Sequence, residues 1–153
     1  MARLDKLGPA KEIAQLASVI GREFMFQLLS EIAPMDEQAL QTHLTSLVNA
    51  ELLHQRGFYP RAKFTFKHAL VQDTAYASLL RATRQQWHAK IADVLVSKFP
   101  NVAENDAALM AHHCTEAGET VRAIGYWELA GLRAQERSAM HEAIHHFTNG
   151  LKL

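Results

Sequence analysis

One short stretch of this sequence alternates apolar and polar residues between segments patterned for helices. In "KFTFK" at 63–67 the two phenylalanines fall on one side of an extended chain, and the lysines and threonine fall on the other. The run "ELLHQ" at 51–55 also suits a strand, and Gly57 and Pro60 between the runs favour a turn. The chain is therefore predicted to be mostly α-helical, with one small β-hairpin.

Three helices are predicted before the hairpin, because apolar residues recur there every three or four positions. The first begins at Pro9 and ends before Gly21, and the second is short and ends before Pro34. The third begins after Asp36, a good N-cap residue. Three helices followed by a hairpin are the element order of a winged-helix domain, although a generic α+β domain can share it.

The rest of the chain is predicted to be helical, with a domain boundary at the short polar segment 101–106 after Pro100. This boundary gives a winged-helix-like domain with two following helices at 1–100 and a helical array at 101–153. The helices of the array are predicted at 107–117, 120–136 and 139–153.

The last two predicted helices share a packing pattern. The order Ala-Ile-x-x-aromatic-x-x-small occurs at 123–130 and again at 143–150. This repetition indicates consecutive antiparallel helices, in a helical-hairpin array that resembles tetratricopeptide packing. Such units do not bury both faces alone, and residue 153 falls inside the last predicted helix. We therefore expect a repeat array that is truncated here and continues in a longer protein.

The composition is that of a soluble globular protein, with 48% hydrophobic residues and 16 residues of each charge. No apolar run approaches the ~18 residues of a membrane span, and no signal peptide precedes the first helix. We therefore expect a cytoplasmic protein with no membrane partner. The single cysteine, Cys114, excludes an internal disulfide and is predicted to be buried.

The charge distribution argues against DNA recognition by the third predicted helix. Residues 23–55 contain five acidic residues and neither lysine nor arginine, whereas phosphate contacts need cations. We therefore do not expect nucleic acid as a partner, and the alternative that stays open is a nonspecific contact led by the hairpin. The basic residues gather at the hairpin and the helices after it: Arg56, Arg61, Lys63, Lys67, Arg81, Arg84 and Lys90.

The string "HEAIHH" at 141–146 matches the H-E-x-x-H pattern of zinc hydrolases. A zinc hydrolase needs a third ligand, but no His, Asp, Glu or Cys follows His146. We therefore predict no catalytic residue and no metal site, and expect His141 and His145 to be only an adventitious surface pair. The buried stripe of this helix is predicted to be Met140, Ile144, Phe147 and Leu151.

Three strings carry a resemblance to a known family: "IGREF" at 20–24, "FKHALVQDTAY" at 66–76, and EAG followed by A-I-x-Y-W-x-x-A-G within 116–131. They resemble the region behind the ATPase core of bacterial signal-transduction ATPases with numerous domains. The most similar group joins a class III adenylate/guanylate cyclase, an AAA-type ATPase and tetratricopeptide repeats.

The resemblance implies a winged-helix domain that follows a nucleotide-binding core and leads into a helical-repeat sensor. It implies a non-catalytic regulatory and protein-interaction segment, with a DNA-binding transcriptional regulator as the alternative. The implied partners are the nucleotide-binding domain of the same parent protein and an unknown protein on the repeats. This chain contains no G-x-x-x-x-G-K-[ST] loop, so no cofactor is expected in it, and ATP or ADP belongs to the parent protein.

The resemblance also selects His68 as a candidate nucleotide-phosphate sensor. In distant relatives among the apoptotic and plant-resistance ATPases, the histidine of a Met-His-Asp motif at a strand-to-helix junction reaches the phosphates of ADP. His68 stands at a similar junction, but Lys67 and Ala69 replace the methionine and the aspartate. The alternative is that His68 caps or packs the start of the helix.

Overall fold

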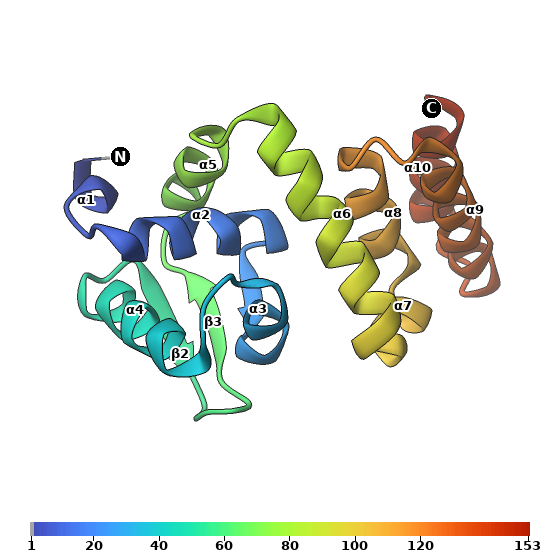
Figure 1. Ribbon diagram of the computed structural model, residues 1–153. Helices are drawn as coiled ribbons and strands as arrows, with labels where there is room; N and C mark the ends of the chain where they lie inside the picture. Colours follow the sequence, from blue (N-terminus) through green and yellow to red (C-terminus); the bar gives the residue numbers. More distant parts are fainter. Residues whose placement is uncertain (1) are drawn as a thin grey trace. The chain divides into compact units, whose positions relative to one another are not determined.

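The computed structural model describes residues 2–153, and most of this chain is helical (Figure 1). The prediction of a mostly α-helical fold is confirmed. The strands are β1 (Glu23–Met25), β2 (Leu53–Arg56) and β3 (Lys63–Phe66). The helices are α1 (Ala2–Asp5), α2 (Pro9–Ile20), α3 (Phe26–Ile32), α4 (Glu37–Asn49), α5 (Ala69–Ala77), α6 (Arg81–Lys98), α7 (Pro100–Asn105), α8 (Ala107–Glu116), α9 (Thr120–Glu136) and α10 (Met140–Leu151).

The chain forms two compact units, an N-terminal unit that ends at Arg84 and a C-terminal unit that begins at Gln85. The division therefore falls within α6, and not at the predicted boundary 101–106. Residues 100–105 form the helix α7, with Pro100 in its first turn, where a missing N–H leaves no helical hydrogen bond unmade. The Asp106 carboxylate then accepts a hydrogen bond from the Leu109 amide (3.0 Å) and starts α8. Residues 101–106 thus belong to α7 and to the cap of α8, both within the C-terminal unit.

The sheet of the N-terminal unit has three antiparallel strands in the order β1-β3-β2, so it is larger than the predicted hairpin. The additional strand, β1, pairs Phe24 with Phe64, and the two rings stack at 5.6 Å. Its three residues are too few to show alternation, and the next residue already starts α3. The sequence therefore predicted the neighbouring helix but not this strand.

The predicted helices of the N-terminal unit form where their apolar faces and caps place them. In α2, Pro9 occupies the first turn and the predicted apolar face is buried. In α4, the Asp36 carboxylate accepts a hydrogen bond from the Ala39 amide (2.8 Å), as the cap prediction requires. Helix α5 packs on α2, where Gln15 Nε2 donates to Ser78 Oγ (2.8 Å).

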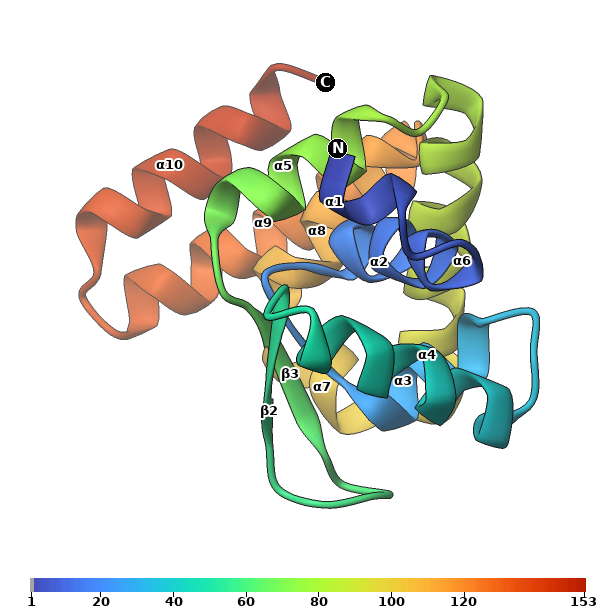
Figure 2. The ribbon, with the colours of Figure 1, turned by 90° about the vertical axis from the view of Figure 1, so that its left-hand side faces the viewer.

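The hairpin of β2 and β3 projects away from the helices of its unit (Figure 2). The inward side chains Leu53, Phe64 and Phe66 are buried, which confirms the alternation predicted for the second strand. At the tip, Phe58 is 87% exposed. The hairpin thus combines a buried apolar face with an accessible tip.

In the C-terminal unit, α8 packs on α9 and α9 packs on α10 (Figure 1). Trp127 Nε1 donates a hydrogen bond to Thr115 Oγ1 (2.9 Å), which fixes the indole of α9 against α8. Helix α9 also packs on α10, through Trp127, Phe147 and Gly150 of the repeated pattern and through Gly131, which follows the pattern. A Cβ added to Gly150 would lie 3.2 Å from Cβ of Trp127, and a Cβ added to Gly131 would lie 2.5 Å from the ring of Phe147. The two helices therefore approach closely because glycine faces an aromatic residue on both sides.

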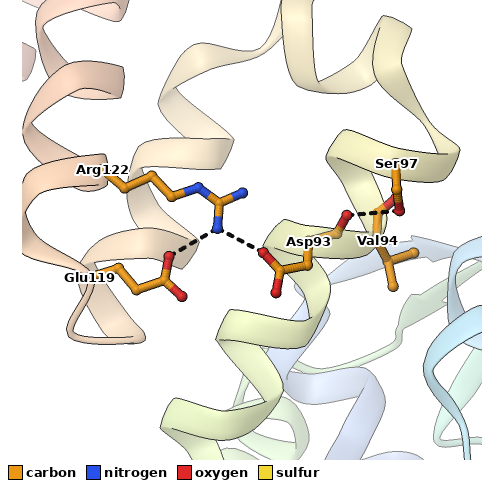
Figure 3. Close-up of polar contacts among 5 residues, drawn as sticks. All are labelled: Asp93, Val94, Ser97, Glu119 and Arg122. Atoms are coloured by element: carbon orange, nitrogen blue, oxygen red, sulfur yellow. Dashed lines mark hydrogen bonds and ion pairs between the residues drawn. The ribbon is translucent and has the colours of Figure 1, made fainter.

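An ion-pair network joins α9 to α6 within this unit (Figure 3). Arg122 Nη1 lies 2.8 Å from the Asp93 carboxylate and 2.9 Å from the Glu119 carboxylate. Burial alone would lower the pKa of Arg122, but these two hydrogen bonds outweigh burial and raise the pKa above its ordinary value. The guanidinium thus stays charged and bridges the helices.

The predicted buried stripe of α10 is wrong. Ile144 is 63% exposed and Leu151 is 88% exposed, and Met140 is also exposed. The small residues Ala143 and Gly150 face α9 instead, because they allow the helices to approach. Phe147 lies at the edge of this contact and is half-buried. Among the described helices, none is both long and apolar enough to cross a membrane.

Candidate functional site

His68 lies at the strand-to-helix junction where the sequence places it. It follows β3 and occupies the position before α5 with an extended backbone (φ −129°, ψ 129°). Its carbonyl oxygen accepts a hydrogen bond from the Val71 amide (3.1 Å), but its side chain makes no cap hydrogen bond to the helix. The side chain is exposed. The backbone of His68 therefore starts α5, while its imidazole is accessible at the surface of the N-terminal unit.

The third predicted helix, α4, presents an uncharged or acidic surface. Its exposed side chains are Glu37, Gln38, Thr42, Thr45 and Asn49. None of them can form a charge-assisted bond to a phosphate. The hairpin, in contrast, presents the exposed cations Arg56, Arg61 and Lys63.

The "HEAIHH" string lies on α10, and its histidines do not converge. His141 and His145 are both exposed, and His145 Nε2 lies 3.2 Å from Asn149 Nδ2. Glu142 forms an ion pair with Arg137 (2.7 Å) rather than facing a cleft. Within residues 2–153, no third metal-ligating side chain joins this pair.

His146 is the histidine of this string that contacts α9. Its ring stacks on Trp127 with 5.6 Å between the ring centroids. Burial is the main cause that lowers the pKa of His146, the nearby His145 lowers it further, and the carboxylates Glu142 and Asp106 oppose the shift. The neutral ring is therefore the form that fits against the indole.

A different set of histidines does converge, and no sequence pattern predicted it. His88 on α6 and His112 and His113 on α8 place a ligand nitrogen each within 4.8 Å of one another. Nδ1 of His88 and Nδ1 of His113 are 2.9 Å apart, so one ring donates a hydrogen bond and the other accepts it. Both rings are 1% exposed, whereas His112 is exposed.

The protonation state of His113, one of the two buried histidines of this cluster, follows from its burial. Burial lowers the pKa of His113 to about 3, and the rings of His88 and His112 add to the shift. The adjacent Cys114 is buried, as predicted, and burial raises the pKa of its thiol although Arg122 opposes the shift. The His113 ring is thus neutral at physiological pH, and the Cys114 thiol beside it is protonated.

The histidine cluster was missed because no spacing rule connects its members. His112 and His113 are adjacent, so they do not share a helix face. His88 lies 25 residues before His113, on another helix. The only signal available was a pair of histidines in an otherwise apolar segment.

An apolar groove lies on the surface of α9 and α10. It has a volume of about 400 Å³ and is lined by Ile124, Glu128, Phe147, Gly150 and Leu151. Ile124 and Phe147 belong to the repeated sequence pattern. The pattern that packs α10 on α9 therefore also leaves apolar side chains on the outer face of this helix pair.

No family model and no solved structure matches this chain. An uncharacterized protein of Rhizobium meliloti (strain 1021) is 30% identical to it over 153 residues, which are 99% of this chain and 15% of that protein. The chain therefore spans only 15% of the length of this relative. In sequence, it is similar to one segment of a longer protein.

Proposed function

We propose that this chain is a non-catalytic regulatory and protein-interaction segment of a multidomain bacterial signalling ATPase, of the group that also carries an adenylate/guanylate cyclase domain. The N-terminal unit serves as a winged-helix domain that packs on the nucleotide-binding domain of the same parent protein. The C-terminal unit begins a tetratricopeptide-like array that receives a protein partner. The segment couples the nucleotide state of the parent to this array.

The order of elements supports the winged-helix assignment. Helix α2 is followed by β1, then by α3 and α4, and then by the hairpin of β2 and β3, which pairs with β1 through β3. In a winged-helix domain, a hairpin projects from a small sheet beside three helices, and the elements of this unit agree with that arrangement. The similarity to one segment of a longer bacterial protein supports a role inside a larger chain.

The exposed apolar surface of α9 and α10 is the observation that carries the proposed interaction. Ile124 and Leu151 line the groove and are exposed, and Ile144 of α10 is exposed as well. Contiguous apolar surface is typical of interaction sites. We assign it to a helix of the following repeat of the parent protein, because Gly150 and Phe147 line the groove with the kinds of residue that join α9 to α10.

Hydrogen exchange tests this assignment. The amides of α10 should exchange at least about tenfold more slowly in the full-length parent than in this chain alone, because a covering helix suppresses local opening. Leu151→Glu should remove most of the difference, because Leu151 lines the groove and is exposed. Val121→Glu is the matched control, since Val121 is exposed on α9 but does not line the groove. Equal exchange in both proteins would contradict the assignment.

The exposed imidazole of His68 supports a role as nucleotide-phosphate sensor. A neutral or charged imidazole can donate a hydrogen bond to a phosphate oxygen. In the full-length protein, His68→Ala should therefore change the fraction of ADP that stays bound after gel filtration. His54→Ala replaces an exposed histidine on β2 and is the control. If ADP retention and basal activity are both unchanged in His68→Ala, His68 is not a sensor.

The alternative function, DNA binding, is favoured only by the basic hairpin. Its cations Arg56, Arg61 and Lys63 are exposed, whereas α4 has no cation to place against phosphates. We therefore expect no micromolar binding of duplex DNA in a gel-shift titration at low salt. Binding that is lost in the double variant Lys63→Gln/Lys67→Gln would favour the DNA-binding alternative instead.

A further inference from the structure

We propose that His88, His112 and His113 form a binding site for a divalent transition-metal ion, with Zn²⁺ as the ion that fits, between α6 and α8 of the C-terminal unit. The three ligand nitrogens already lie within 4.8 Å of one another. Neutral imidazole is a good ligand for Zn²⁺, and three histidines with one open position form an established class of zinc site.

The distances between the nitrogens are close to those of a tetrahedral site. Zn–N bonds of about 2.0–2.1 Å place two ligand nitrogens about 3.4 Å apart. The Nδ1 atoms of His88 and His113 are 2.9 Å apart, so this pair has to open by about half an ångström. The third nitrogen belongs to His112, which is exposed and can approach by side-chain rotation.

Burial prepares two of the three ligands. His88 and His113 are each 1% exposed, and they belong to the buried faces of α6 and α8. Packing thus limits their rotation before an ion arrives. The exposed His112 gives the ion a path from solvent, and a water molecule can fill the fourth position.

Protons balance when the ion binds. In the metal-free pair, one Nδ1 carries the proton that the other accepts. Both Nδ1 atoms need a free lone pair to bind the metal, so the donating ring has to take the tautomer that carries its proton on Nε2. A change of tautomer moves a proton within the ring and releases none from it. The group contains no carboxylate, so its ligands do not compensate the two positive charges of the ion.

Calorimetric titration of Zn²⁺ into the complete, chelator-stripped chain tests the site. One Zn²⁺ should bind per chain, and His112→Ala should weaken binding at least about tenfold, as loss of one of three ligands requires. His112 is exposed, so this variant should stay folded. The control is His141→Ala/His145→Ala, which removes the exposed pair on α10 and should leave the affinity unchanged. Co²⁺ in place of Zn²⁺ should give the visible absorption of a tetrahedral site.

Several outcomes would overturn the site. One is the absence of saturable Zn²⁺ binding to the complete chain. Another is undiminished binding in His112→Ala, which would leave only the buried pair. The third is loss of binding in His141→Ala/His145→Ala, which would assign the ion to the surface of α10.

Discussion

At the residue scale, the contact between α9 and α10 depends on the absence of two side chains. Gly131 faces the ring of Phe147, and Gly150 faces Cβ of Trp127. A methyl group at position 131 would enter space that the Phe147 ring occupies, and one at position 150 would be in tight contact with Cβ of Trp127. Protein interiors are close-packed, so the volume of one added carbon atom changes the stability of the folded state.

We expect Gly131→Ala to destabilise the C-terminal unit by about 1–3 kcal/mol, the usual effect of overpacking. The added Cβ would lie 2.5 Å from the Phe147 ring, which has to move. Gly125→Ala on the same helix is the control, since no atom lies within 4 Å of its added Cβ. It should stabilise α9 by about 0.5–1 kcal/mol through helix propensity. Urea unfolding of both variants measures the difference, and equal effects would contradict this packing.

Sequence patterns predicted the contact between α9 and α10, but they did not predict the histidine cluster. The positions of Trp127 and Phe147 were predictable because both occupy the same place in a repeated pattern. The convergence of His88 with His113 was not, because it depends on the path of the chain between two helices and leaves no periodicity. The predicted nucleotide contact of His68 stays a prediction.

At the scale of elements, α10 shows why a helix pattern alone does not decide which face is buried. Its apolar residues Ile144 and Leu151 are exposed, while the smaller Ala143 faces α9. Apolar periodicity shows that a helix is amphipathic, but close approach to a neighbour selects small residues. The strand β1 was missed for a related reason, because three residues are too short for a period.

The packing of α10 should depend on pH through His146. Its pKa is lowered from its ordinary value near 6.5, chiefly by burial. Between the two pKa values the unfolded state therefore binds more protons, so stability is complete above about pH 6.5 and is lost as the pH falls through the folded pKa. With EDTA present, the loss of stability from pH 7 to pH 5 should be smaller in His146→Gln than in the wild type.

Urea midpoints at several pH values measure this dependence. His141→Gln is the control, because His141 is exposed on the same helix. It should keep the wild-type dependence. If His146→Gln and His141→Gln give the same pH dependence, His146 does not couple protons to the folding of α10.

At the scale of the whole molecule, the chain consists of two compact units with their own cores. Each unit contains a helix whose first turn is capped by an aspartate. Asp36 caps α4 in the N-terminal unit, and Asp106 caps α8 in the C-terminal unit. The caps therefore offer a matched pair of changes, one for each unit.

Asp36→Ala and Asp106→Ala should each cost about 1 kcal/mol, the usual effect of losing an N-cap. Hydrogen exchange should show the loss in the unit that carries the substitution, with little change in the other. Asp73→Ala removes an exposed aspartate within α5 that makes no helix cap, and should cost nothing. Lower protection across both units in either cap variant would show that they open as one.

Most of the helices could be predicted from the sequence, because proline, glycine and aspartate mark their ends. The division into units was not, because a helix crosses it. A polar segment such as 101–106 is typical of a linker, but here it forms α7 and the cap of α8. The division between Arg84 and Gln85 has no such marker, since α6 continues through it.

The facing glycines and aromatic rings of α9 and α10 also limit how this sequence can diverge. A larger residue at position 131 requires a smaller one at 147, so Gly131→Ala combined with Phe147→Leu should recover part of the stability that the single change loses. Positions 127 and 150 are linked in the same way. In proteins related to this chain, the residues of each pair should therefore change together. Such covariation at both pairs would indicate that α10 packs on α9 in those proteins as well.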